Sequence, residues 1–191
     1  MKVKVVLGVS NRHVHLKEET YNILFDEPIK IVKELKQPGQ FASDKFVTIK
    51  NSDRKIERVR VLGPFRDYNQ VEISKTDSYF LKVNPPIRDS GDLDGSESIT
   101  LVTDKAEVTL KEGCIIATRH IHITPEDMKK YGFKENERIQ IKVEGEKGGI
   151  LNNVRFKVAK ESSFELHLDT DDANAFGLKT EDLLEIIEMS K

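Results

Sequence analysis

The sequence has no tryptophan, a single cysteine and no long apolar run. One cysteine, Cys114, excludes an internal disulfide and is typical of a reducing compartment. No stretch approaches the ~20 apolar residues that a membrane-spanning helix needs, and the start, MKVKVVLGVS, lacks the apolar length and cleavage site of a signal peptide. The net charge of −2 gives no general attraction to nucleic acid or to an anionic membrane. We therefore expect a cytoplasmic protein with neither nucleic acid nor membrane as a partner.

What the chain does contain is many short runs of alternating apolar and polar residues. Its 191 residues, 37% hydrophobic and 34% charged, suit one large or two small soluble domains. The runs are β-branched and bounded by Gly, Pro, Asn or Asp, as strands are. They are KFVTIKN, ERVRVLG, NQVEISK, SITLVTD, AEVTLKE, RIQIKVEGE, VRFKVAK and FELHLDT. The pattern predicts a mainly β fold with short α-helices, built as barrels or sandwiches.

Helical signals are fewer and shorter than strand signals. In TPEDMKKYGF, Thr124 suits the N-cap, Pro125 the first turn, Asp127 a capping box and Gly132 the stop. KEETYNILF, after His15, predicts a weaker counterpart of this helix. DDANAFGL and TEDLLEII predict short helical turns near the C-terminus.

The two halves of the chain resemble each other, which indicates an internal repeat. Arg12-His13-Val14-His15 matches Arg119-His120-Ile121-His122 at a separation of 107 positions. The segment Glu57–Asp77 aligns without gaps on Asn152–Asp172 at a separation of 95, which places Glu72 on His167 and Asp77 on Asp172. The difference predicts an insertion in the first half, around IKIVKELKQPGQF. Chance similarity between short strands is the alternative explanation.

The repeated His-x-His motifs predict two metal centres. Side chains at positions i and i+2 of a strand point to one face, so each motif can offer two imidazoles to one metal. A catalytic zinc ion takes three protein ligands and keeps one position open. The repeat supplies the third ligand in each half and uses all five histidines, giving the sets His13, His15, Glu72 and His120, His122, His167. Zinc suits these donors, although Co²⁺, Ni²⁺ or Fe²⁺ would accept them, and surface histidine pairs are the alternative.

Two further side chains bear on the predicted site. Arg66 lies six residues before Glu72, past a Gly-Pro turn, and a guanidinium can grip phosphate through two hydrogen bonds. Its counterpart in the repeat is Glu161, so this arginine is unique to one half. Cys114 lies in the apolar stretch EGCIIATRH and is interpreted as a small core residue.

Longer motifs resemble a known family. GVSNRHVHL, QPGQFA, VRVLGPFRDYNQVEISKTD, RDSGDLDGS, IIATRHIHITPED and LHLDTDDANAFGL are similar to the phosphate propanoyltransferases, the PduL-type phosphotransacylases, from about Val6 to about Ile187. The resemblance implies transfer of a short acyl group, acetyl or propanoyl, between coenzyme A and inorganic phosphate. It also implies two tandem, pseudo-twofold-related β-barrels around a two-zinc site. The expected halves are residues 12–117 and 118–191, with the N-terminal strand, residues 1–11, completing the second.

Matching residue by residue, the resemblance places metal ligands on the two sets above and phosphate binding on Arg66. It implies coenzyme A contacts at Ser10, Arg60, Leu62, Tyr79 and Asn174, with the adenine stacked on Tyr79. Two departures affect the expected coenzyme pocket: Asn69 replaces an expected threonine, and SYFLKVNPP differs from the usual small-residue stretch. No amphipathic extension precedes the first motif, so we do not expect encapsulation in a microcompartment by that route.

The same residues allow other functions. A dinuclear zinc hydrolase of thioesters or phosphoesters would use the same ligands with water as the nucleophile, and would not need phosphate. A binding module with structural metal sites would need a fourth protein donor at each site. For the transacylase, we expect zinc to act as a Lewis acid in a direct transfer between acyl-coenzyme A and phosphate. A homodimer is compatible with this reading.

Overall fold

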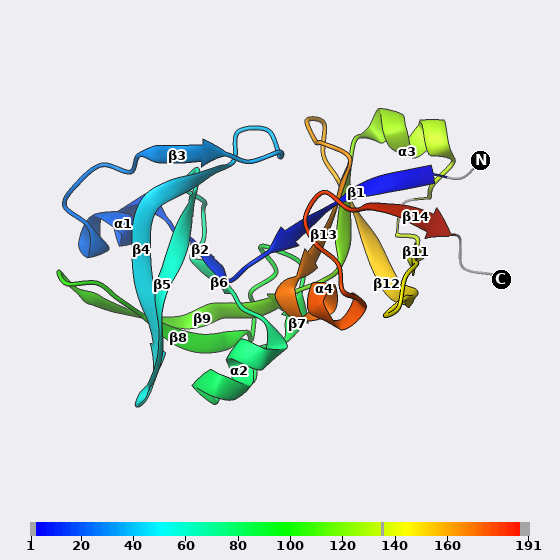
Figure 1. Cartoon of the computed structure of the whole chain (residues 1–191). Helices are drawn as coiled ribbons and strands as arrows, with labels where there is room; N and C mark the ends of the chain where they lie inside the picture. The colour runs from blue at the N-terminus through cyan, green and yellow to red at the C-terminus, as the bar shows by residue number, and fades with distance from the viewer. Residues whose placement is uncertain (1–2, 135, 188–191) are drawn as a thin grey trace. The chain divides into compact units, whose positions relative to one another are not determined.

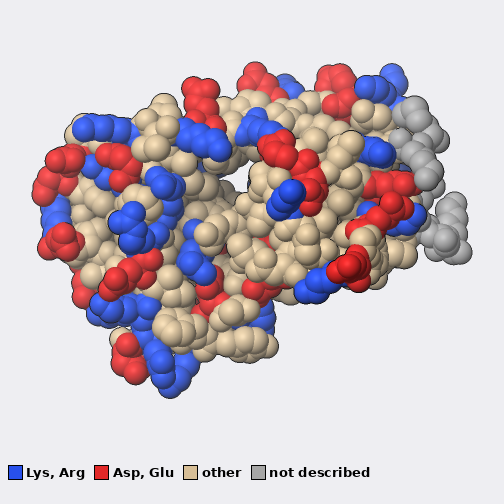
Figure 2. Space-filling view, viewed as in Figure 1, with Lys and Arg blue, Asp and Glu red and all other residues tan. Residues whose placement is uncertain are grey.

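The computed structural model describes residues 3–134 and 136–187, which form two compact units. One unit contains residues 11–117, and the other combines residues 3–10 with residues 118–187 (Figure 1). The predicted mainly β class is confirmed, because short helices accompany two closed barrels of six strands each. Figure 2 shows acidic and basic side chains interspersed over the visible face of each unit, as the near-neutral net charge suggests.

The first barrel is closed by six strands of residues 11–117. Its pairing order is β4, β5, β2, β6, β9 and β8, and β8 returns to pair with β4. The bounds are β2 His13–His15, β4 Phe41–Asn51, β5 Arg54–Gly63, β6 Gln70–Glu72, β8 Glu97–Val102 and β9 Glu107–Ala117. Two further strands pair with the ends of barrel strands: β3 (Ile31–Glu34) with the start of β4, and β7 (Ile87–Arg88) with the end of β9.

The second barrel has the order β1, β13, β10, β12, β11 and β14, and it closes where β14 pairs with β1. The bounds are β1 Val3–Ser10, β10 His120–Ile123, β11 Ile139–Val143, β12 Gly149–Val158, β13 Glu165–Asp169 and β14 Leu183–Ile187. The N-terminal strand was predicted within residues 1–11, of which residues 1 and 2 lie outside the described residues.

The two barrels have equivalent topologies. Strands β2 and β10, which carry the His-x-His motifs, each pair in parallel with one neighbour, β5 or β12, and antiparallel with the other, β6 or β13. Strands β9 and β1 then pair in parallel with β6 and β13. Each strand that leads into a histidine motif therefore belongs to the other unit: β1 leads into β2, and β9 leads into β10. Among the described strands of the second barrel, β3 has no counterpart, and β3 lies where the insertion was predicted.

Each barrel has a separate apolar core. The first is built around residues such as Val14, Val61 and Val71, and the second around residues such as Ile121 and Leu166, all of them fully buried. Side chains alternate across a strand, so the histidines flanking Val14 and Ile121 face the outside of each barrel wall. The burial of the valine and isoleucine thus determines where the histidines point.

Short helices follow the histidine strands and the third-ligand strands: α1 Glu18–Leu24, α2 Lys75–Leu81, α3 Pro125–Tyr131 and α4 Thr170–Phe176. The predicted start and stop of α3 are confirmed, since the Thr124 side chain accepts from the backbone N–H of Asp127 and Gly132 has a left-handed φ of 75°. Its Asp127 carboxylate contacts the Thr124 hydroxyl, so the predicted reciprocal capping box is not seen there. Among the described helices, none is long and apolar enough to cross a membrane.

One helix prediction was wrong, and one helix was missed. TEDLLEII was predicted to be helical, but Leu183–Ile187 is strand β14, paired with β1 and β11. Its apolar residues fit either period, and the buried positions Leu184 and Ile186 alternate as a strand requires. Helix α2 was not predicted, although it has a full capping box between Ser74 and Asp77.

Candidate metal centres

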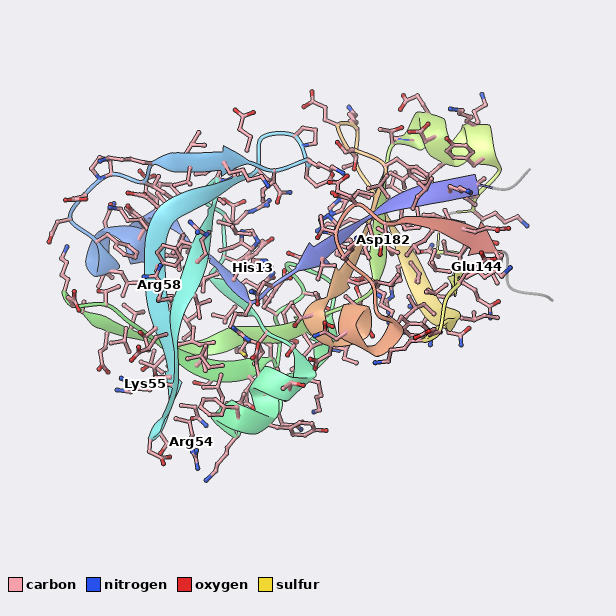
Figure 3. All side chains as sticks on the ribbon, in the orientation of Figure 1. His13, Arg54, Lys55, Arg58, Glu144 and Asp182 are labelled. Carbon is pink, nitrogen blue, oxygen red and sulfur yellow. The ribbon has the colours of Figure 1, made fainter. Side chains whose placement is uncertain are left out.

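The first candidate centre lies on the outer wall of the first barrel. His13 and His15 come from β2, and Glu72 on β6 lies opposite His13 in the antiparallel register. One potential ligand atom from each of the three lies within 4.8 Å of the others, and Nε2 of His13 is 3.4 Å from Oε2 of Glu72. Figure 3 shows His13 on this strand. The structure therefore brings the predicted first set together.

The second candidate centre repeats this arrangement on the second barrel. His120 and His122 come from β10, and His167 on β13 lies opposite His120. Their potential ligand atoms also lie within 4.8 Å of one another, and the Nε2 atoms of His120 and His122 are 3.2 Å apart. The second predicted set is likewise brought together.

The first histidine of each motif is held in a defined tautomer. His13 Nδ1 lies 2.8 Å from the carbonyl oxygen of Asn11, and His120 Nδ1 lies 2.8 Å from that of Thr118. A carbonyl oxygen can only accept, so each Nδ1 donates its proton, and in the neutral form of the ring the lone pair is on Nε2. Metal-binding histidines are commonly oriented through their second nitrogen in this way.

The metal-free first centre also favours a positive charge on His13. Burial lowers the pKa of His13, but the charge and hydrogen bond of Glu72 raise it by more, so that the pKa lies above its ordinary value. The positive charge of Arg66 lowers the same pKa, which means that the guanidinium is close enough to act on this ring. The site thus combines a carboxylate, imidazoles and a nearby arginine.

Arg66 lies in the loop after β5, and its backbone N–H donates to the carbonyl oxygen of Leu16 at 2.9 Å. The buried Nε of its guanidinium has no hydrogen-bond acceptor among the residues that the structure describes. A buried charged donor is normally paired. The arginine therefore has hydrogen-bonding capacity to offer an anion, whereas its repeat counterpart, Glu161, is exposed.

Two arginine–aspartate pairs support the two histidine strands. Arg12 donates from Nε and Nη2 to the two carboxylate oxygens of Asp77, at 2.8 Å each. Arg119 donates in the same manner to Asp172, at 2.7 and 2.6 Å. These four residues are equivalent in the repeat, so the pairing supports the register deduced from sequence.

The residues expected to contact coenzyme A lie in different units. Arg60 and Leu62 are on β5 of the first barrel, and Tyr79 is on α2, 71% exposed, with the Lys75 ammonium 5.0 Å from its ring centre. Ser10 on β1 and Asn174 on α4 belong to the second unit. Their coenzyme role stays a prediction.

Three polar residues near the strands have contacts that the sequence did not indicate. The side chain of Asn69, which replaces an expected threonine, accepts from the backbone N–H of Lys17 and donates to the Thr20 hydroxyl. It thereby fastens the start of α1. Gln70 and Glu165, two positions before Glu72 and His167, were not singled out, although each contacts the neighbouring candidate ligand. Their equivalent positions in the repeat were the available signal.

Comparison with known proteins assigns this architecture to a class of enzyme. A family model described as phosphate propanoyltransferase matches residues 6–179. The chain is therefore an acyltransferase.

Its relatives carry the same name. The chain is 46% identical over 187 residues to a phosphate propanoyltransferase of Thermotoga maritima, covering 96% of this chain and 89% of that protein. It is 40% identical to one from Rhodopseudomonas palustris, covering 96% and 82%, and 43% identical to one from Salmonella typhimurium, covering 91% and 83%. This chain belongs to the phosphate propanoyltransferase family.

Proposed function

We propose that the chain transfers a short acyl group, acetyl or propanoyl, between coenzyme A and inorganic phosphate, using two zinc ions. The observation that carries the proposal is an arginine, Arg66, that has unused hydrogen-bonding capacity and acts electrostatically on the first set of candidate ligands. Its buried Nε has no acceptor among the described residues, and its charge acts on His13. An anion-binding group next to a candidate metal centre is what transfer to phosphate requires.

The residues of both centres fit zinc. Each set offers three imidazole or carboxylate donors, and three protein donors leave a position open in a tetrahedral zinc site. When bound, zinc supplies Lewis-acid polarisation and stabilises a thiolate. The ligands would be His13, His15 and Glu72 at one centre, and His120, His122 and His167 at the other.

The protein groups have separate tasks in this proposal. Arg66 binds phosphate through two parallel hydrogen bonds and orients one of its oxygens toward the thioester. That oxygen forms a bond to the carbonyl carbon, the carbon–sulfur bond breaks, and coenzyme A leaves as the thiolate. Holding both substrates in one site removes much of the entropic barrier to a two-substrate reaction.

Cys114 is unsuited to carry the acyl group. Its side chain is fully buried in the core of the first barrel, and burial raises the pKa of its thiol to about 12. The thiolate is the nucleophilic form of cysteine, and it is scarce at neutral pH for such a thiol. This supports direct transfer without a cysteine intermediate.

Thiol release from acetyl- and propanoyl-coenzyme A, measured with and without phosphate, tests the proposal. We expect release to depend on phosphate and to be matched by acyl phosphate formation. Release at the same rate without phosphate would identify a hydrolase that uses the same ligands. We also propose that coenzyme A contacts Ser10, Arg60, Leu62, Tyr79 and Asn174, which alanine variants would test through the KM for coenzyme A.

A further inference from the structure

Each third ligand has a polar neighbour two residues earlier on the same strand. Gln70 precedes Glu72 on β6, and Glu165 precedes His167 on β13. The two neighbours occupy equivalent positions in the repeat, and each shares a strand face with its ligand. Gln70 lies opposite His15 and Glu165 lies opposite His122, so each completes a square of four side chains on the barrel wall.

The Gln70 amide donates to the carboxylate of Glu72. Its Nε2 lies 2.6 Å from Oε1 of Glu72 and 2.9 Å from the Ser90 hydroxyl, while its Oε1 accepts from the backbone N–H of Gly91 at 2.7 Å. Because the Gly91 N–H can only donate, the amide oxygen must face it and the amide nitrogen must face Glu72. Gln70 is fully buried, so these contacts restrict the orientation of the Glu72 carboxylate.

The Glu165 carboxylate contacts the ring of His167. Its Oε2 lies 2.8 Å from Nε2 of His167, and the Glu165 side chain is only 6% exposed. An ionised carboxylate can only accept, so the proton of a neutral His167 ring is on Nε2 and the lone pair is on Nδ1. The neutral His167 ring thus has the opposite tautomer from the neutral rings of His13 and His120, in which the lone pair is on Nε2.

The backbone beside Glu165 leaves room for this carboxylate. Gly8 of β1 is in register with His167, and a Cβ at Gly8 would lie 2.8 Å from Oε1 of Glu165. In the first barrel the residue in register with Glu72 on the equivalent strand β9 is Ile115, a fully buried side chain. The glycine Gly8 therefore lies beside the contact between Glu165 and His167. The larger Ile115 lies beside the contact between Gln70 and Glu72.

We propose that Gln70 and Glu165 are positioning residues, each matched chemically to the ligand that it orients. A carboxylate ligand is oriented by a hydrogen-bond donor, which Gln70 provides for Glu72. An imidazole ligand is oriented by a hydrogen-bond acceptor, which Glu165 provides for His167. At the second centre this makes Nδ1 of His167 the metal-binding atom. The inference rests on the proposed metal centres and adds to them the groups that hold each third ligand.

The first test is spectroscopic and needs no variant. In the zinc-loaded protein, long-range ¹H–¹⁵N correlation spectra report which ring nitrogen of a histidine binds metal. We expect Nδ1 for His167 and Nε2 for His13 and His120. Metal binding through Nε2 of His167 would overturn the proposal. In Glu165→Gln, whose amide can serve as donor or acceptor, we expect both His167 tautomers to appear.

The second test separates the two centres. His13→Ala isolates the second centre and His120→Ala the first, and zinc affinity is measured by competition with a chromophoric chelator. Loss of an orienting partner weakens metal binding about 10–100-fold. We expect Glu165→Gln to weaken zinc binding by this factor in the His13→Ala background, where only the second centre is intact. In the His120→Ala background, where only the first centre is intact, zinc affinity should stay unchanged. Gln70→Glu, which places two carboxylates together, should weaken the first centre alone.

Glu126→Gln, an exposed glutamate at the start of α3, is the matched control and should change neither affinity. If both centres bind zinc and Glu165→Gln leaves the second unaffected, the positioning role is wrong while the proposed function stands. If the unaltered chain binds zinc at neither centre, the proposed function itself fails. Should Glu165→Gln not fold, the spectra of the unaltered protein decide.

Discussion

Arg12 and Asp77 form a two-hydrogen-bond ion pair that ties the residue before His13 to the first turn of the helix after Glu72. The pair joins the strand of one candidate ligand to the element that follows the strand of another. Its partner in the repeat, Arg119 with Asp172, does the same for His120 and His167. Each ion pair therefore helps to hold together two candidate ligands that come from different strands.

Arg12→Lys keeps the charge but loses the planar fork. The Asp77 side chain is only 7% exposed, so its carboxylate would be left poorly paired. We expect a loss of about 1–3 kcal/mol in the free energy of unfolding, together with weaker zinc binding at the first centre. Denaturant unfolding and zinc titration measure these effects. Arg54→Lys, on the more exposed Arg54, is the control and should leave both unchanged.

Metal content tests the two ligand sets directly. After purification with zinc present, the chain should carry about two divalent metals, one for each three-donor site. His13→Ala and His120→Ala should each remove about one of these. Elemental analysis of the purified proteins gives the stoichiometry, and a content near zero in the unaltered chain would contradict the mechanism.

Glu72→Gln tests a ligand that sequence reasoning reached through the repeat alone. An amide is a poorer metal donor than a carboxylate, so zinc affinity at the first centre should fall. Glu57→Gln lies in the same repeat segment and has no role as a ligand, and its partner Lys55 is exposed. Equal zinc affinity in the two variants, measured by chelator competition, would show that Glu72 is not a ligand.

Arg66 separates transfer to phosphate from hydrolysis. Arg66→Lys should raise the KM for phosphate and lower turnover, because the lysine cannot reproduce the bidentate geometry. Arg66→Ala should cost more, about 2–4 kcal/mol of transition-state stabilisation. Zinc content and coenzyme A binding without phosphate should stay unchanged. Normal phosphate dependence in Arg66→Ala would place the anion site elsewhere.

The raised pKa of His13 predicts a pH-dependent stability in the metal-free protein. Because the folded-state pKa lies above the unfolded value, the His13–Glu72 interaction stabilises the fold below the ordinary histidine pKa and is lost as pH rises through the folded pKa. Denaturant unfolding with chelator, between about pH 5.5 and pH 8.5, should show this loss around the histidine range. In Glu72→Gln, where the charge partner is gone, this part of the pH dependence should vanish.

Most strands, and the grouping of both candidate ligand sets, could be predicted because they follow from local alternation and from one repeat. The period-2 burial of Val14 and Ile121 already determines that the flanking histidines share a face. The register of the repeat added Glu72 and His167, which lie more than 40 residues beyond the nearest motif histidine in the chain.

The remaining features depend on contacts that the sequence does not display. Leu183–Ile187 fits a helix as well as a strand, and its pairing with β1, from the opposite end of the chain, decides between them. Gln70 aligns with Glu165, but one side chain is an amide and the other a carboxylate. The reason for this difference is visible only in the structure, where Gln70 contacts Glu72 and Glu165 contacts His167. Helix α2 depends on a capping box within a segment whose exposed Tyr79 and Phe80 obscure an amphipathic pattern.

The position of β1 has a consequence for folding during synthesis. The first barrel is complete once Ala117 has been made, because its six strands lie within residues 11–117. Strand β1 is made earlier than all of them, yet its partners β13 and β14 are the last two of the described strands to be made. Domains generally fold as units from the N-terminus while the chain grows. If the first barrel folds in this way, β1 stays unpaired until β13 and β14 have been made, and an unpaired strand can pair with other chains in the meantime.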